Sequence, residues 1–158
     1  MVEYKWNPET HTATCKIEVQ GKKYIGTAVC HEHDFDFESE KVGQVIAGTR
    51  AQIKMLQDYA NNSLVPQLKA LMEYYYTIKH SKNYNPKSYE SKMLYRRIQF
   101  IKNQLTAVKE EINNRKQELK EYIDQKDEFY KKLRANRNKS TSDTPSRGLR
   151  AKMNNLIN

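Results

Sequence analysis

The feature that most constrains the fold is a long helical repeat in the C-terminal half of the chain. No glycine or proline occurs between positions 87 and 144. Within this stretch, residues recur at spacings of four and three, which is the period of a helix that packs along one seam. The seam positions are Leu94, Ile98, Ile101, Leu105, Val108, Ile112, Arg115, Leu119, Tyr122, Lys126, Phe129 and Leu133. The pattern predicts one long helix over residues 86–137, which must pair with the preceding helix, with a second copy of the chain, or with both.

A period-two pattern near the N-terminus predicts strands instead. Between positions 12 and 31, small and apolar residues alternate with polar ones, as in a half-buried β-hairpin. A two-residue turn at Gly21-Lys22 would place Val19 opposite Tyr24. The sequence therefore predicts a β-hairpin over residues 12–31.

One face of this hairpin is shallow, because it carries Gly26 and Ala28. A hairpin alone is marginally stable, so a helix is expected to lie across this face. Cys15 and Cys30 share the face without lying opposite each other, and both are expected to be reduced thiols of a cytoplasmic protein. The polar residues 1–11 are expected to be irregular.

A further helix is predicted over residues 39–80, after an acidic stretch. Ser39 is the expected N-cap, with acidic neighbours that favour the start of a helix. The letters NNSLVPQ at 61–67 interrupt the apolar stripe, so a break or kink is expected near Pro66.

The predicted fold class is therefore α+β. A small N-terminal antiparallel β-sheet or hairpin is followed by long helices that form an antiparallel helical hairpin, and this hairpin is expected to dimerise. Residues 1–139 are expected to form a single domain. Residues 140–158 are rich in serine, proline and asparagine and predict a disordered tail.

The charge of the chain favours acidic partners. The net charge is +9 over 158 residues, and residues 81–139 contain 16 basic but only 8 acidic side chains. Such a surplus attracts nucleic acids, nucleotides or acidic proteins. No apolar run approaches the roughly 20 residues of a membrane span, so no membrane association is expected.

No catalytic motif is present. The phosphate loop, the dinucleotide fingerprint, the nucleophile elbow and paired CxxC motifs are all missing from the sequence. The letters HEHD at 31–34 resemble a metal cluster, but consecutive residues of a strand point to alternate faces, so a solvated acidic loop is the preferred interpretation. No enzymatic activity, metal or cofactor is expected.

Residues 74–97 instead have the composition of a nucleotide-binding surface. Six tyrosines and six basic residues occur here with Glu90 as the one carboxylate. Tyrosine rings stack on bases, and lysine and arginine neutralise phosphates. The alternative is a solvated helix surface with a few core-facing tyrosines. The candidate ligand-binding residues are Tyr75, Tyr76, Asn85, Lys87, Tyr89, Lys92, Arg96, Arg97, Arg134 and Arg137, with Arg50 as a candidate for a second anion site.

Two stretches carry a resemblance to a known family. They are GKKYIGTAVCHEHDFDFESEKVGQVIAGTRAQI at 21–53 and HSKNYNPKSYESKMLYR at 80–96. Over roughly residues 12–139 the chain resembles the phage Thoeris anti-defence proteins of the first type. The resemblance implies a β-sheet with long helices, assembled into dimers or higher oligomers in the cytoplasm of an infected bacterial host.

What the resemblance implies for function is sequestration without catalysis. Such proteins hold the cyclic ADP-ribose isomer made by TIR-domain defence proteins, and some also hold cyclic oligonucleotides at a separate site. Their pocket uses an aromatic residue and an asparagine of one subunit, which Tyr75 or Tyr76 and Asn85 could supply here. The arginines come from the neighbouring subunit, and Arg96, Arg97, Arg134 and Arg137 are the candidates.

Two other functions stay open from the sequence. The first is a basic coiled-coil protein that binds nucleic acid without sequence specificity, although no DNA-reading motif is present. The second is a structural helical adaptor that binds no small molecule.

Overall fold

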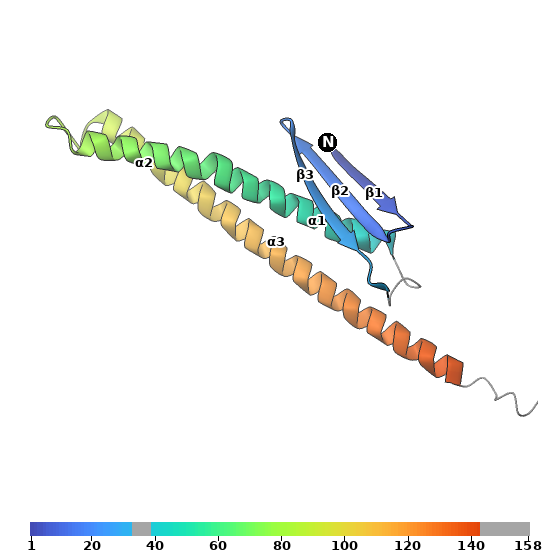
Figure 1. Ribbon diagram of the computed structural model, residues 1–158. Helices are drawn as coiled ribbons and strands as arrows, with labels where there is room; N and C mark the ends of the chain where they lie inside the picture. The colour runs from blue at the N-terminus through green and yellow to red at the C-terminus, as the bar shows by residue number, and fades with distance from the viewer. Residues whose placement is uncertain (33–38, 143–158) are drawn as a thin grey trace, which may run out of the picture. The chain divides into compact units, whose positions relative to one another are not determined.

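The computed structural model describes residues 1–32 and 39–142. Predictions for the acidic segment 33–38 and for the tail beyond Ser142 lie outside these residues. The fold is α+β, with a small sheet followed by long helices, as the sequence predicts (Figure 1). The chain forms two compact units, Met1–Glu121 and a second that begins at Tyr122.

The sheet has three antiparallel strands in the order β1-β2-β3: β1 (Val2–Asn7), β2 (Thr12–Val19) and β3 (Lys22–Val29). The expectation that residues 1–11 are irregular is therefore wrong. β1 alternates apolar and polar side chains but is only six residues long, which gives a weak periodic signal. After it, the side chain of Asn7 accepts hydrogen bonds from the backbone N–H groups of Glu9 and Thr10 and so shapes the turn.

The predicted hairpin exists, but its register differs by two residues. The turn lies at Gln20-Gly21, not at Gly21-Lys22, and Ile17 rather than Val19 pairs with Tyr24. Both turn residues have positive φ, 50° and 78°, as a type I′ turn requires. A shift of two residues leaves every side chain on its predicted face, because strand side chains alternate with period two.

The helix α1 (Glu40–Tyr59) covers one face of the sheet, as expected from the small residues Gly26 and Ala28 on that face. The core between them is built from small side chains and is completed by partly buried larger ones. Its buried members are Ala13, Cys15, Ile17, Ala28, Ala47 and Ala51. Small residues on both sides let the helix backbone approach the sheet closely.

The helical path continues beyond α1 without a break. Ser39 caps it as predicted, since the side-chain oxygen accepts a hydrogen bond from the Val42 N–H at 3.3 Å. A π-helical turn, η2 (Ala60–Leu64), joins α1 to α2 (Val65–Lys79). The break expected near Pro66 is instead this wider turn, which accommodates a proline that lacks an N–H and would otherwise clash with the preceding turn.

The third helix, α3 (Tyr89–Ser142), begins three residues later than predicted and extends past residue 137. Up to Glu121 it runs antiparallel to α1 and α2, so these helices form the predicted helical hairpin (Figure 1). Seam residues Ile98, Ile101 and Ile112 are buried in this pairing. The polar seam residue Arg115 donates hydrogen bonds to Gln52 of α1 and to Glu111.

The second unit contains the described part of α3 from Tyr122 onward. Its seam side chains are partly or largely exposed, and Phe129 is 54% exposed. The ammonium of Lys126 lies 5.2 Å from the centre of the Tyr122 ring. Dimerisation along this seam stays a prediction.

Candidate ligand-binding site at the α2–α3 turn

The turn between α2 and α3 is stabilised by its own polar side chains. Asn85 accepts a hydrogen bond from the Lys87 N–H at 2.9 Å through its side-chain oxygen. Ser88 caps α3, since its hydroxyl accepts from the Ser91 N–H at 3.2 Å. The two serine hydroxyls also bond to each other at 2.9 Å. The sequence NYNPKS therefore encodes an ordered connection between the helices.

Beside this turn lies a hollow of about 280 Å³, which we call the turn hollow. It combines aromatic rings with cationic side chains from the loop and both helices. Its lining residues are Tyr75, Tyr84, Pro86, Ser91, Lys92, Tyr95 and Arg96. Rings and cations in one concave site suit a ligand that has both a planar group and a phosphate.

A second hollow, of about 250 Å³, shares Tyr75 and Tyr95 with the first. We call it the groove hollow, because it follows the contact between α2 and α3. Its lining residues are Met72, Tyr75, Tyr76, Lys79, His80, Tyr95, Ile98, Gln99 and Lys102. The rings of Tyr76 and His80 lie against each other with their centres 4.1 Å apart. Tyr75 and Tyr95 thus form a common wall between the two hollows.

The phenol groups in the turn hollow interact with each other. A hydrogen bond with Tyr75 raises the pKa of Tyr84, and desolvation contributes in the same direction. The raised pKa keeps the Tyr84 phenol protonated at physiological pH. The hydroxyl groups of tyrosines can donate and accept hydrogen bonds at the edge of a ligand.

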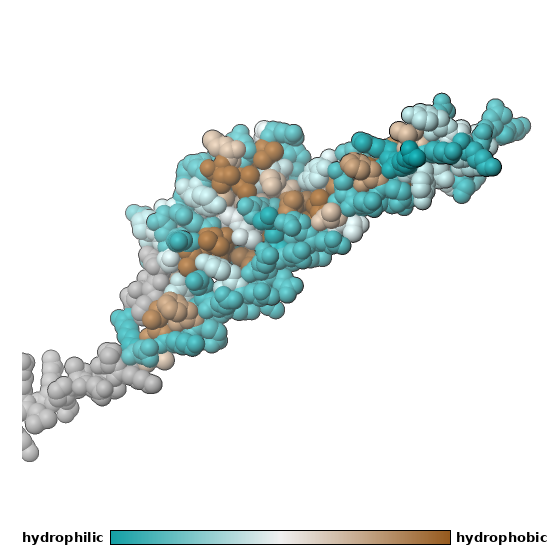
Figure 2. All heavy atoms as spheres, turned by 180° about the vertical axis from the view of Figure 1, so that it is seen from behind, coloured by the Kyte–Doolittle hydropathy of each residue, from teal (hydrophilic) through white to brown (hydrophobic). Residues whose placement is uncertain are grey.

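The electrostatic environment of the two hollows favours anions. No carboxylate is among their lining residues, whereas four cationic side chains are: Lys79, Lys92, Arg96 and Lys102. On the face drawn in Figure 2, the end of the molecule that carries this turn is mostly hydrophilic. The N-terminus of α3 contributes less than its position suggests, because Ser88 already occupies the Ser91 N–H.

The structure brings some of the predicted site residues together and separates others. Tyr75, Lys92 and Arg96 line the turn hollow, and Tyr76 lines the groove hollow. Of the residues predicted within 74–97, four line neither hollow: Asn85, Lys87, Tyr89 and Arg97. The side chain of Asn85 shapes the turn, and the guanidinium of Arg97 lies 5.6 Å from the centre of the Phe100 ring.

Three further arginines predicted to bind anions are not among the residues that line the two hollows. Arg50 of α1 donates a hydrogen bond to the backbone carbonyl of Thr27 at 2.6 Å, so its guanidinium is held at the edge of the sheet. Arg134 and Arg137 belong to the second unit. A role for any of the three in ligand binding stays a prediction.

Several lining residues were not on the predicted list. They are Tyr84, Tyr95, Lys79, His80 and Lys102 among the polar and aromatic ones. Helical spacing could have identified some of them, because Lys79 and His80 follow the predicted Tyr75 and Tyr76 by one turn along α2. Tyr84 could not be found this way, since its position depends on the loop conformation.

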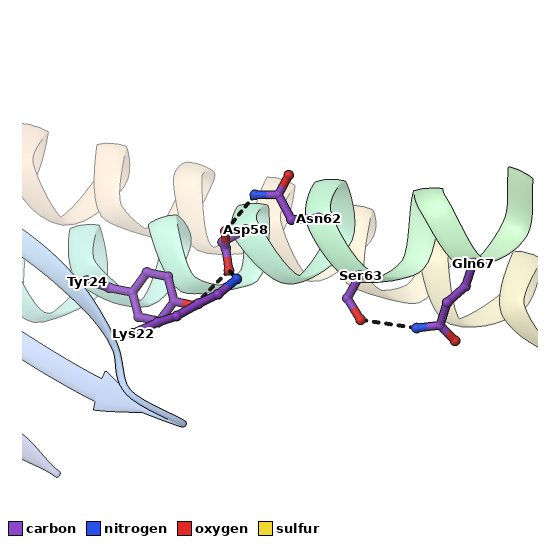
Figure 3. Close-up of polar contacts among 6 residues, drawn as sticks. All are labelled: Lys22, Tyr24, Asp58, Asn62, Ser63 and Gln67. Atoms are coloured by element: carbon purple, nitrogen blue, oxygen red, sulfur yellow. Dashed lines mark hydrogen bonds and ion pairs between the residues drawn. The ribbon is translucent and has the colours of Figure 1, made fainter.

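Another hollow, of about 490 Å³, lies between the tip of the β2–β3 hairpin and η2. At its rim, Asp58 accepts hydrogen bonds from Lys22 at 2.8 Å, from Tyr24 at 2.7 Å and from Asn62 at 2.7 Å (Figure 3). These bonds, with Lys22 as the largest cause, lower the pKa of Asp58 to about 2. Because Lys22 and Tyr24 belong to β3 and Asp58 to α1, these bonds fasten the hairpin to the helix.

Comparison of the chain with protein-family models, curated proteins and solved structures found no match. Among the described helices, none has both the length and the apolar composition that crossing a membrane requires. Within residues 1–32 and 39–142, no three histidine, cysteine or acidic side chains gather as metal ligands would.

Proposed function

We propose that the chain is a phage anti-defence protein that captures a TIR-derived cyclic ADP-ribose isomer and holds it without cleaving it. The observation that carries the proposal is the pair of hollows at the α2–α3 turn. They place tyrosine rings next to lysine and arginine side chains. The resemblance of residues 21–53 and 80–96 to the Thoeris anti-defence proteins supports the same ligand.

The chemistry of the ligand matches the two kinds of side chain. A cyclic ADP-ribose isomer contains a purine and a pyrophosphate. An exposed ring such as Tyr95, 53% exposed, offers a stacking surface for the base, worth about 1–3 kcal/mol in single-strand binders. Arg96 and Lys92 lie in the same hollow and can neutralise the pyrophosphate.

The size of the hollows argues for a second subunit. Each is slightly smaller than the roughly 300–1,000 Å³ of a typical small-molecule pocket. A cyclic ADP-ribose isomer would therefore need both hollows, and its outer side would stay exposed to water. Tight capture therefore requires a neighbouring chain to close the site, which agrees with the dimer that the resemblance implies.

The test separates capture from catalysis. The purified protein is mixed with the TIR-derived signal, freed of unbound ligand, and then heated until it unfolds. Recovery of the intact signal in proportion to the protein supports sequestration. Recovery of a hydrolysed product indicates an enzyme, and absence of any retained signal contradicts the proposal.

An oligonucleotide arm tests the nucleic-acid alternative. Non-specific binding to nucleic acid weakens steeply with salt, because it depends on counterion release. If a single-stranded oligonucleotide binds at low salt and competes with the cyclic signal, the basic surface serves nucleic acid instead. If the signal stays bound in excess oligonucleotide, the hollows are selective for it.

A further inference from the structure

The outer edge of β1 pairs with no other strand of the described residues. The Glu18 N–H donates a hydrogen bond to the Met1 carbonyl at 2.8 Å, and the Met1 amine donates one to the Glu18 carbonyl at 2.9 Å. Because such pairs alternate along antiparallel strands, the backbone groups of Glu3, Lys5 and Asn7 point to β2. Those of Val2, Tyr4 and Trp6 therefore point away from the sheet. Among the described residues, no strand lies beyond β1.

The opposite edge of the sheet is protected. On β3, the carbonyl of Ile25 accepts a hydrogen bond from Lys54 at 2.6 Å, and that of Thr27 accepts one from Arg50 at 2.6 Å. Both long cationic side chains come from α1 and occupy edge carbonyls that could otherwise bind a further strand. One edge is thus closed by side chains of the same chain, whereas among residues 1–32 and 39–142 no side chain donates a hydrogen bond to the outward carbonyls of β1.

We propose that β1 pairs antiparallel with β1 of a second copy of this chain. The two sheets then form one continuous sheet of six strands, with a twofold axis perpendicular to it at Tyr4. Both copies of α1 lie on the same face of this sheet. This inference does not depend on the proposed ligand.

The charges of β1 select a single register. With Tyr4 opposite Tyr4, Val2 faces Trp6 and Glu3 faces Lys5 of the partner subunit. The outward backbone groups then meet one another, and Glu3 and Lys5 occupy the closer, non-hydrogen-bonded positions, where side chains interact best. A shift by two residues places Glu3 against Glu3 or Lys5 against Lys5, which repel.

Side-chain exposure along β1 agrees with a covered edge. Val2 and Tyr4 are 56% and 46% exposed, although both project toward the face that α1 covers. In the proposed register each apolar side chain lies beside an apolar side chain of the partner subunit. Glu3 already lies 3.3 Å from Lys5 and 3.2 Å from Lys16, so a further cation across the interface joins an existing network.

The register can be tested by cross-linking the full-length chain in a Cys30→Ser background, in which the remaining Cys15 is buried. Glu3→Cys protein is mixed with Lys5→Cys protein under mild oxidation. The expected result is a disulfide between positions 3 and 5, identified by peptide mass, because facing non-hydrogen-bonded residues have Cα atoms about 4.5 Å apart. Either variant alone should cross-link far less.

The matched control uses the protected edge. Ile25→Cys mixed with Thr27→Cys places two thiols, also two residues apart, on the exposed face of β3, and this mixture should give little cross-linked dimer. Equal cross-linking at the two edges, or in the single variants, would overturn the proposal. So would the absence of cross-linking at β1.

A second measurement uses proline, which removes one backbone donor. Val2→Pro deletes an outward N–H of β1, and Val29→Pro deletes an outward N–H of β3. Sedimentation equilibrium should show dimerisation weakened roughly tenfold or more by Val2→Pro, since two hydrogen bonds are lost per dimer. Val29→Pro should leave it unchanged. Equal effects of the two variants, both with native circular dichroism, would refute edge pairing.

Discussion

Gly26 of β3 lies directly against the backbone of α1 at Ala47. A Cβ atom at Gly26 would overlap the carbonyl oxygen of Ala47 and the backbone nitrogen of Ala51. Since both are backbone atoms, no side-chain movement can relieve the overlap. The distance between helix and sheet is therefore set by the absence of a side chain at this position.

Gly26→Ala is expected to force α1 away from the sheet and to lower the free energy of unfolding by about 1–3 kcal/mol, the usual cost of overpacking a core. Urea denaturation of the isolated chain measures this loss of unfolding free energy. Thr27→Ala is the control, since Thr27 points to the exposed face; its cost should stay below about 1 kcal/mol. A smaller loss at Gly26 than at Thr27 would contradict this packing argument.

The sheet illustrates which structural features the sequence predicts and which it does not. The alternation around Cys15 and Gly26 correctly predicts which face is buried, because burial repeats every two residues. It does not distinguish registers that differ by two residues. The turn decides the register, and Gln20 adopts positive φ although it is not a typical residue for that conformation.

In the candidate site, too, the sequence predicts some features and not others. Composition predicts that tyrosines and cations gather at the α2–α3 turn, and the hollows there contain both kinds. Which of two adjacent arginines lines the hollow depends on the exact phase of α3, which composition does not give. The side-chain oxygen of Asn85 accepts a hydrogen bond from the Lys87 N–H, as is common for an asparagine in a turn, and a contact between Asn85 and a ligand stays a prediction.

The contact between Asp58 and Lys22 predicts a pH dependence of stability. The folded-state pKa of Asp58 is about 2, below the value of about 4 for an unfolded aspartate. Such a lowered pKa stabilises the fold above pH 4, and this contribution is lost as pH falls from about 4 to about 2. Lys22→Ala removes the largest cause of the lowered pKa of Asp58. The variant should therefore be less stable than the parent above pH 4, and this difference in stability should shrink as pH falls from about 4 to about 2.

Thermal unfolding followed between pH 7 and pH 2 measures this difference. Lys23→Ala is the matched control, because Lys23 precedes Tyr24 on the other face of β3. Its difference from the parent should stay constant with pH. A constant difference for Lys22→Ala as well would show that the ion pair does not anchor the hairpin tip.

The π-helical turn places Leu64 in the core of the helical hairpin. Leu64 is 1% exposed, whereas its neighbour Val65 is 41% exposed. Leu64→Ala should cost about 2–5 kcal/mol of unfolding free energy, because it leaves a cavity between the helices. Val65→Ala should cost about 1 kcal/mol or less. Chemical denaturation compares the two, and equal losses would mean that the turn does not direct Leu64 inward.

The adjacent residues Arg96 and Arg97 provide the sharpest test of the candidate site. Arg96 lines the turn hollow, whereas Arg97 lies over the ring of Phe100. Loss of a charge-assisted hydrogen bond to phosphate costs about 1.5–3 kcal/mol. Arg96→Ala should therefore raise the dissociation constant for the cyclic ADP-ribose isomer roughly ten- to hundredfold.

Isothermal titration calorimetry measures the change, and Arg97→Ala is the control with the same loss of charge. Its dissociation constant should stay within roughly threefold of the parent's, because charges outside the site act only through screened, long-range attraction. If both variants weaken binding equally, the signal responds to general positive charge and the turn hollow is not its site. If neither does, the ligand binds elsewhere on the chain.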